Sequence, residues 1–201
     1  NDAIVPLSSC PELGDEDRTM LGTEQESWLS DGLAAAETTW KVLAQQTVMS
    51  SLVIGDLVLN VDQWDGYPAA RQRLLQFIAD NNISDVVVLT GDIHSAAGGN
   101  LAPASDDGSR TPVAVEFVGT SITSGSLVDI VPGGAALVTA DKFPGVAYIN
   151  VRDHGYGRCT VTPGEWTTEF VVVESVKTAD AAARVDATCV TKQGEPVVTR
   201  L

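Results

Sequence analysis

One stretch decides the fold of this chain: Asp85-Val86-Val87-Val88-Leu89-Thr90-Gly91-Asp92-Ile93-His94. Its first half is a continuous aliphatic, largely β-branched run, which is typical of a parallel strand buried on both faces. Gly91 then allows the backbone to turn tightly. In an open α/β sheet, functional groups gather at the carboxyl ends of the strands. The stretch therefore predicts a buried strand over residues 85–89, with Asp92 and His94 at its functional end.

Asp92 and His94 are candidates for metal ligation. They are two residues apart, and in an extended loop both side chains point the same way. A carboxylate and an imidazole aimed at one point make half of a metal site. The residues alone also allow a bland alternative, in which the aspartate caps backbone amides and the histidine lies on the surface.

The segments around this strand predict an α/β layered domain. A helix is expected over residues 23–38, where Thr23 and Glu26 match a capping box. A second helix is expected from Pro68, which suits a first helical position, to about residue 81. Helix, strand, helix, strand is the order of an α/β fold. The other expected strands lie at residues 40–45 and 113–118, and the expected loops at 47–67 and 102–111.

The chain becomes rich in short strands after about residue 145. Glycine and proline separate these strands, and two segments have the composition of hairpin turns, Gly155-Tyr156-Gly157 and Thr162-Pro163-Gly164-Glu165. We divide the chain into an irregular segment (1–22), a catalytic domain (23–175) and a terminal strand or tail (176–201). Further strands are expected at residues 146–151, 158–161, 169–173, 188–191 and 196–199.

Composition excludes several classes of function. The chain has 201 residues and a net charge of −15. Nucleic-acid binding needs a basic face that neutralises phosphates, so that class is not expected. Electrostatic docking on an anionic membrane is disfavoured for the same reason. No apolar run approaches the roughly 20 residues of a membrane helix, and the chain opens without a signal peptide. The acidic composition fits an extracellular enzyme or a binder of hard cations, whose ligands are carboxylates. We expect the chain to be matured from a precursor or cut from a larger chain.

Three cysteines make an odd count. In an oxidising compartment one pair can form, and we favour Cys159 with Cys189, because both lie in strand-like stretches and Cys10 is remote. The alternative is three reduced cysteines. Their spacing does not match a zinc motif.

Other residues are weaker candidates. His154 suits a general acid or an additional ligand, or else is an ordinary hairpin histidine. Trp64, Asp65 and Tyr67 precede the second helix and either line a substrate pocket or pack at the helix entry. Ser121 lies outside any G-x-S-x-G elbow, which argues against a serine nucleophile.

Taken together, several strings resemble the PhoD-like alkaline phosphatase and phosphodiesterase family, in family order over roughly residues 15–175. This family belongs to the calcineurin-like metallophosphoesterases, whose core is a two-sheet α/β sandwich. Within it, the chain looks closest to a secreted actinobacterial branch that includes a metal-dependent phospholipase D. The strings are Arg18-Thr19-Met20-Leu21-Gly22, Trp40-Lys41-Val42-Leu43, Asp62-Gln63-Trp64-Asp65-Gly66-Tyr67-Pro68, Leu89-Thr90-Gly91-Asp92-Ile93-His94, Glu116-Phe117-Val118 and Ser121-Ile122-Thr123-Ser124.

The resemblance implies that Asp92 and His94 are metal ligands. It also implies iron and calcium, although the residues alone leave zinc or manganese possible. Only the second half of such an enzyme is matched, and the family's earlier Cys, Asp, Tyr and Asn ligands are not found upstream of Arg18. We therefore expect the C-terminal chain of a proteolytically nicked enzyme, paired with the N-terminal chain of the same precursor. The family's Asn-Pro-His string is replaced here by Phe143-Pro144-Gly145, so its histidine does not map directly onto His154.

The resemblance implies a secreted metal-dependent phosphoesterase. The favoured activity is hydrolysis of phosphodiesters of the phospholipase D type, with in-line attack by a metal-generated hydroxide. Because the chain is acidic, we expect calcium to bridge it to a phospholipid surface. One alternative is a phosphomonoesterase used for phosphate scavenging. Another is a non-catalytic accessory module, in which replacing Asp92 or His94 has no effect.

Overall fold

The computed structural model describes residues 5–105, 108–130 and 134–201. Its centre is a five-stranded sheet with the order β2-β5-β7-β6-β8. Strands β2, β5 and β7 pair in parallel, and β6 runs antiparallel to its neighbours β7 and β8. The bounds are Lys41–Ala44 (β2), Val86–Thr90 (β5), Ala96–Leu101 (β6), Ala114–Val118 (β7) and Val146–Asn150 (β8).

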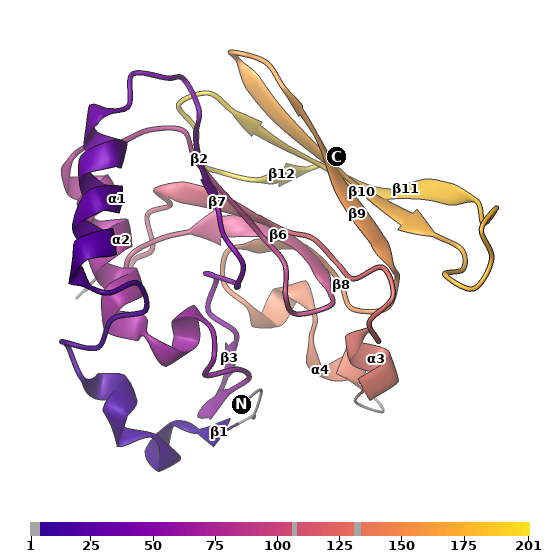
Figure 1. Ribbon diagram of the computed structural model, residues 1–201, viewed down its shortest axis with the longest axis horizontal. Coiled ribbons are helices and arrows are strands. Elements are labelled where there is room, and N and C mark those ends of the chain that lie inside the picture. Colours follow the sequence, from indigo (N-terminus) through magenta and orange to yellow (C-terminus); the bar gives the residue numbers. More distant parts are fainter. Residues whose placement is uncertain (1–4, 106–107, 131–133) are drawn as a thin grey trace.

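Two helices, α1 (Thr23–Ala35) and α2 (Pro68–Asp80), cover one face of this sheet (Figure 1). The buried side of α2 packs in one cluster with Val86 and Val88 of β5. Burying such a side chain contributes about 1.5–3 kcal/mol, so this contact fixes the helix layer on the sheet. The predicted strand and both predicted helices are confirmed.

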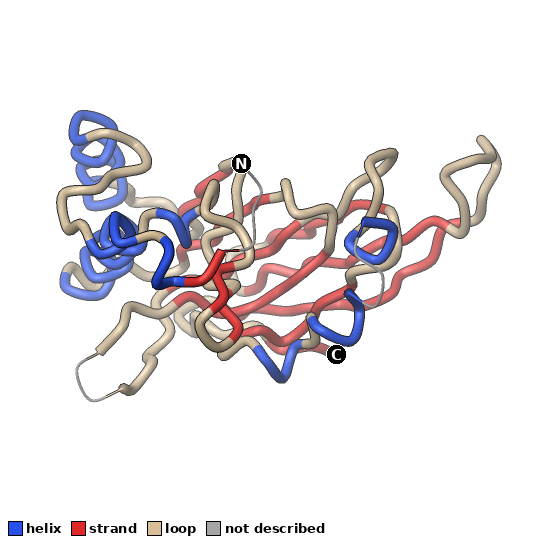
Figure 2. Tube along the Cα trace, turned by 90° about the horizontal axis from the view of Figure 1, so that it is seen from below, coloured by secondary structure: helices blue, strands red, loops and turns tan. Residues whose placement is uncertain are grey.

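A second, antiparallel sheet covers the other face, with the order β12-β11-β10-β9. Val87 of β5 is fully buried in a cluster with Phe117 of the first sheet and Phe170 of the second. Figure 2 shows the strands gathered in the middle of the molecule, beside the two long helices. The predicted α/β class and the two-sheet sandwich are confirmed. The bounds are Gly155–Val161 (β9), Glu165–Val173 (β10), Ala183–Lys192 (β11) and Thr199–Arg200 (β12).

Shorter elements complete the fold. Residues 47–67, expected to be a loop, contain strands β3 and β4, and β4 also pairs with β1. Residues 176–201 supply β11, which lies inside the second sheet. The remaining bounds are Val5–Pro6 (β1), Val53–Ile54 (β3), Leu57–Val58 (β4), Leu127–Ile130 (α3), Gly134–Leu137 (α4), and the 3-10 helices Leu7–Ser9 (η1), Pro11–Gly14 (η2), Trp64–Gly66 (η3) and Ala140–Lys142 (η4).

Strand β6 was missed because Ala-Ala-Gly-Gly-Asn-Leu lacks β-branched residues. The structure explains this composition by close packing. A Cβ atom on Gly99 would lie 2.8 Å from the carbonyl oxygen of Gly145, and one on Gly98 would lie 3.3 Å from the Phe117 ring. Glycine is therefore needed where the strand passes between crowded neighbours.

Two local predictions were wrong. Gly155 and Gly157 lie inside strand β9 rather than in a turn. The capping box does not form, because Gly22 is the N-cap of α1 and the Glu26 carboxylate accepts a hydrogen bond from the Thr19 hydroxyl instead.

The predicted Cys159–Cys189 disulfide is also wrong. Both cysteines pair in register with Thr168, one from each side of strand β10. Adjacent strands lie about 4.8 Å apart, so the two cysteines are separated by about twice that distance. A disulfide requires Cα atoms within about 7 Å. Cys10, Cys159 and Cys189 are all free thiols.

Among the described residues, no helix has the length and apolar character needed to cross a membrane.

Candidate metal centre

The candidate centre lies where the parallel strands β2 and β5 end. The Gly91 amide donates to the Gln46 carbonyl just after β2, and the Gly119 amide donates to the Thr90 carbonyl just before the turn. These bonds hold the segments after β2, β5 and β7 side by side at one edge of the sheet. Carboxyl ends of parallel strands are the usual place for a functional site in such sheets.

The backbone after β5 bends sharply. Asp92 has a φ of 74° and His94 a φ of 52°, both in the left-handed region. Gly91 is not among the positive-φ residues, so the turn strains Asp92 and His94 and does not use the freedom of the glycine. The sequence-based assumption that Asp92 and His94 lie in an extended loop is therefore wrong. Strained non-glycine residues cluster at functional sites, which makes this bend a candidate on structural grounds.

Asp92 is exposed and is held from one side by Gln63. The Gln63 side chain is buried, and its Nε2 donates to Asp92 Oδ2 at 2.9 Å. This bond orients the carboxylate and leaves Oδ1 for another partner. Sequence reasoning missed Gln63, although it lies directly before Trp64 in a string already singled out.

His94 is oriented by a backbone carbonyl. Its Nδ1 lies 2.9 Å from the carbonyl oxygen of Gly125. Because a carbonyl only accepts, Nδ1 carries the proton, and in the neutral ring Nε2 holds the lone pair. Metal-binding histidines commonly donate their other ring N–H to a carbonyl in this way. The contact thus leaves Nε2 with the lone pair that metal binding would require.

Asp92 and His94 fit part of a metal site. They offer one carboxylate oxygen and one imidazole nitrogen, a donor pair suited to iron, zinc or manganese. Within the part of the chain that the structure describes, no cluster of three or more His, Cys, Asp or Glu side chains is placed to hold a metal ion. The pair could supply two donor atoms, so a bound ion would need further ligands from other groups.

Trp64, Asp65 and Tyr67 are engaged inside the protein. Asp65 is buried, with Oδ1 2.6 Å from Arg71 Nη1 and Oδ2 accepting from the Leu52 amide at 2.6 Å. Trp64 is buried and donates from Nε1 to a glutamine side chain, and Tyr67 lies under the guanidinium of an arginine. Of this segment, Gln63 is the residue with a hydrogen bond to Asp92.

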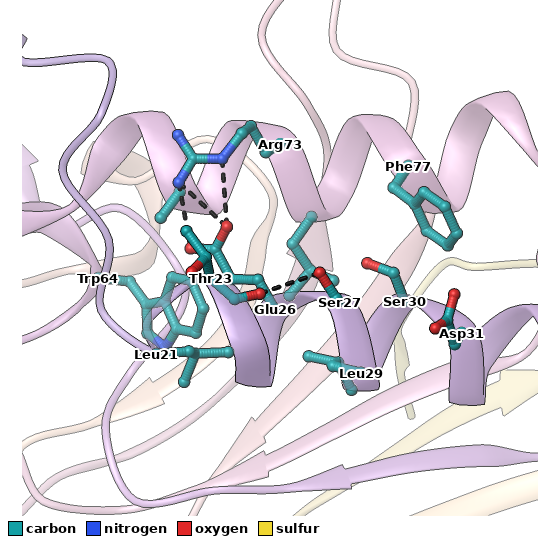
Figure 3. A pocket seen from close by; sticks show the side chains of 12 residues that line it. Leu21, Thr23, Glu26, Ser27, Leu29, Ser30, Asp31, Trp64, Arg73 and Phe77 are labelled. Atoms are coloured by element: carbon teal, nitrogen blue, oxygen red, sulfur yellow. Dashed lines mark hydrogen bonds and ion pairs between the residues drawn. The ribbon is translucent and has the colours of Figure 1, made fainter.

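A pocket of about 390 Å³ lies between α1 and α2. Figure 3 shows Arg73 of α2 facing Glu26 of α1 at this pocket, with Trp64 beside them. Neither Asp92 nor His94 lines it. We therefore place the candidate site by chemistry and topology and do not base it on this pocket.

Glu116 of β7 anchors the segment after β2. Its fully buried carboxylate accepts hydrogen bonds from the Met49 and Ser50 amides at 2.7 and 2.8 Å. The Thr90 hydroxyl also donates to it, at 3.2 Å. Burial raises the pKa of the Glu116 carboxyl above its ordinary value. These contacts make Glu116 a support for the ends of the strands.

His154 contacts Ser121 and Asp129, which gives the residue types of a serine triad. Its Nδ1 lies 3.1 Å from Ser121 Oγ, and its Nε2 lies 3.8 Å from Asp129 Oδ2. The Ser121 hydroxyl, however, donates its single proton to the Ser124 carbonyl at 2.7 Å, so it does not donate to His154 as a base. The geometry does not activate Ser121, in agreement with the missing nucleophile elbow.

A family model described as PhoD-like phosphatase matches residues 5–170. The chain belongs to the PhoD-like phosphatase family. The resemblance read from the sequence strings is confirmed.

The proteins that this chain resembles are much longer than the chain. It is 39% identical over 191 residues to alkaline phosphatase D of Bacillus subtilis (strain 168), covering 90% of the chain and 31% of that protein. A solved structure of PhoD matches with a TM-score of 0.83 and 34% identity, covering 100% of this chain and 38% of that one. A purple acid phosphatase from yellow lupin (Lupinus luteus) seeds matches with a TM-score of 0.46 and 12% identity, covering 80% and 27%. The chain spans about a third of the length of the PhoD-like relatives it matches.

Proposed function

We propose that this chain forms part of a metal-dependent phosphoric ester hydrolase, in which Asp92 and His94 are metal ligands. The observation that carries the proposal is the hydrogen bond from His94 Nδ1 to the Gly125 carbonyl, which leaves Nε2 as the ligand atom beside an oriented Asp92. Membership of the PhoD-like family supports the reaction class. The proposed metals are iron and calcium, with zinc or manganese as alternatives.

The two residues have different proposed tasks. His94 binds a transition metal through Nε2, because imidazole suits such ions. Asp92 contributes carboxylate oxygen to the same ion or to a neighbouring calcium, and Gln63 keeps that carboxylate in place. Bound metal ions supply Lewis acidity toward the phosphoryl oxygens and activate water for in-line attack.

The remaining ligands, in this proposal, come from polypeptide outside these residues, the N-terminal chain of the same precursor. The open edge of β2 supports this arrangement, because within the described residues β2 pairs only with β5. Trp28 is 69% exposed and Val42 44% exposed beside that edge, around a pocket of about 280 Å³. A parallel strand added there would end at the same edge of the sheet as Asp92 and His94.

The proposed substrate is a phosphodiester, with phospholipid as the favoured class and calcium as the bridge to it. A phosphomonoester is the main alternative, and the relative called alkaline phosphatase D supports it. We also propose secretion, which the acidic composition supports. A non-catalytic accessory module is the third possibility.

One set of assays separates these functions. Protein isolated with its co-purifying polypeptide would be characterised by native mass spectrometry and elemental analysis. The same sample would be assayed on phosphatidylcholine, a simple phosphodiester and a simple phosphomonoester, before and after chelation. The proposal predicts bound metal, a second chain and diester hydrolysis that chelation abolishes. Preferential hydrolysis of the phosphomonoester would favour the alternative.

Two variants and one control link activity to the site. Asp92→Asn and His94→Gln are expected to lower activity at least 100-fold, because each removes a proposed ligand. Asp80→Asn, at the exposed end of α2, is expected to retain activity. Unchanged activity or metal content in both site variants would support the accessory module and contradict the proposed function.

A further inference from the structure

The loop between β7 and α3 connects the two histidines of the chain. His94 contacts the Gly125 carbonyl in this loop, and His154 contacts the Ser121 side chain four residues earlier. The chain contains only these two histidines, and both direct Nδ1 to the same loop. The loop is therefore a physical link between a proposed ligand and a residue with no assigned role.

Three hydrogen bonds, which we call the clamp, fasten the start of this loop to residues 153–155, where β9 begins. The Thr120 hydroxyl donates to the Asp153 carbonyl at 3.0 Å, and the Gly155 amide donates to the Ser121 carbonyl at 3.1 Å. The side-chain contact between His154 Nδ1 and Ser121 Oγ, at 3.1 Å, lies between them. The clamp thus contains two bonds to the backbone and one bond that depends on the His154 ring.

Proton positions in the clamp follow from its partners. The Ser121 hydroxyl donates to the Ser124 carbonyl at 2.7 Å, so its oxygen can only accept from His154. His154 Nδ1 therefore donates. The resulting chain runs from His154 through the Ser121 hydroxyl to the Ser124 carbonyl, and the next carbonyl, that of Gly125, accepts from His94.

The far side of the loop is fastened as well. Asp129 Oδ2 accepts from both the amide and the hydroxyl of the buried Ser126, each at 2.8 Å. The same oxygen lies 3.8 Å from His154 Nε2. His154 thus faces both Ser121, near the start of the loop, and Asp129, just after its end. Its 18% side-chain exposure indicates a packed position with little access to a substrate.

We propose that His154 is a positioning residue: through Ser121 it holds the loop whose Gly125 carbonyl sets the ring orientation and tautomer of His94. The consequence for metal binding rests on the proposed function, in which His94 Nε2 is a ligand. Partners of this kind, which orient a ligand from behind, typically change metal affinity 10–100-fold when removed.

Nuclear magnetic resonance tests the tautomer directly. A long-range ¹H–¹⁵N spectrum of the histidine rings contains two sets of signals, which His154 variants assign. With neutral rings, the wild type is expected to show His94 with its proton on Nδ1. Ser121→Ala and His154→Leu are expected to shift His94 toward a mixture of tautomers. His154→Asn retains a donor at the position of Nδ1 and is expected to preserve the wild-type state.

Ser124→Ala is the matched control, because Ser124 takes part through its backbone carbonyl, which the substitution retains. Backbone amide spectra would show that each variant is folded. The zinc dissociation constant is then expected to rise about tenfold in Ser121→Ala and His154→Leu, and to stay unchanged in Ser124→Ala.

The two proposals fail separately in these measurements. A His94 tautomer that is unchanged in His154→Leu and Ser121→Ala overturns the positioning role. A mixture in His154→Asn as large as that in His154→Leu overturns it too. The other outcome is that the His94 tautomer changes in the variants as expected, but His94→Gln does not weaken zinc binding. That result leaves the positioning role intact and contradicts the proposed ligand function.

Discussion

The hydrogen bonds of Asp65 give this residue a structural role. Its sequence context, between two aromatic residues before a helix, suits a pocket lining. In the structure both carboxylate oxygens are occupied, one by Arg71 and one by the Leu52 amide. A buried charge with its partner removed is strongly unfavourable. The contacts of Asp65 therefore tie the loop after β2 to helix α2.

Replacing Arg71 by methionine is expected to destabilise the fold by about 3 kcal/mol, because Asp65 would remain buried without its partner. Chemical denaturation measures this change. Arg158→Met is the control, since Arg158 pairs with Glu169 on an exposed face with 54% of its side chain accessible. That change should cost much less than the loss of Arg71, because water screens an exposed ion pair. Equal losses in both variants would contradict the structural role of the Asp65–Arg71 pair.

The thiols should differ sharply in reactivity. Cys189 is fully buried, and burial raises the pKa of its thiol to about 11. Cys159 is exposed on β9. Because the thiolate is the reacting form, a thiol reagent at neutral pH is expected to modify Cys159 and to spare Cys189 until the protein unfolds. Peptide mapping after labelling measures this, and a linked Cys159–Cys189 peptide would refute the assignment of free thiols.

Glu116 should leave a signature in the pH dependence of stability. Its folded pKa is raised by burial, so the folded state binds the proton more tightly than the unfolded state. The stabilisation is complete at pH below the unfolded pKa and is lost as pH rises through the folded pKa. Relative to Glu116→Gln, the wild type is expected to lose free energy of unfolding across this range. A wild-type free energy of unfolding that rises with pH relative to that of Glu116→Gln would contradict this prediction.

At the scale of elements, the pairing of β9 with β10 leaves no room for a side chain at Gly155. A Cβ atom there would lie 1.9 Å from the Val171 carbonyl oxygen of the neighbouring strand β10. At Gly157, two residues along the same strand, the nearest atom would be a Thr168 methyl at 3.9 Å. The two glycines therefore have different roles despite their similar sequence context.

Gly155→Ala is expected to destabilise the protein by about 1–3 kcal/mol, because β9 and β10 must separate to accommodate the methyl group. Gly157→Ala is the matched control and should be nearly neutral. Thermal unfolding of both variants measures the difference. A smaller loss for Gly155→Ala than for Gly157→Ala would contradict the strand pairing.

Sequence patterns predicted those elements whose own residue types indicate their burial or their ends. The run at residues 86–88 identified a strand buried on both faces, and Pro68 identified the start of α2. Strand β6 was not predictable in this way, because its glycines are required by the neighbouring Gly145 backbone and Phe117 ring. Contacts of that kind depend on the assembled sandwich and leave no local pattern.

At the scale of the whole molecule, the same distinction separates the two halves of the candidate site. Asp92 and His94 were predictable because they follow a recognisable strand. The Gly125 carbonyl that orients His94 lies 31 residues away, and any residue type supplies a carbonyl. Gln63 reaches Asp92 across 29 residues through a side chain with no distinctive chemistry. Tertiary packing, rather than sequence pattern, brings these supports to Asp92 and His94.

The central claim is that Asp92 and His94 bind metal together, and paramagnetic relaxation with Mn²⁺ tests it most directly. In the wild-type chain combined with its N-terminal partner chain, trace Mn²⁺ is expected to broaden the backbone amide signals of residues 91–95 and of Gly125 first. Asp92→Asn and His94→Gln should each abolish this broadening, while Asp80→Asn should retain it. Broadening centred elsewhere, or unchanged in both site variants, would contradict the account.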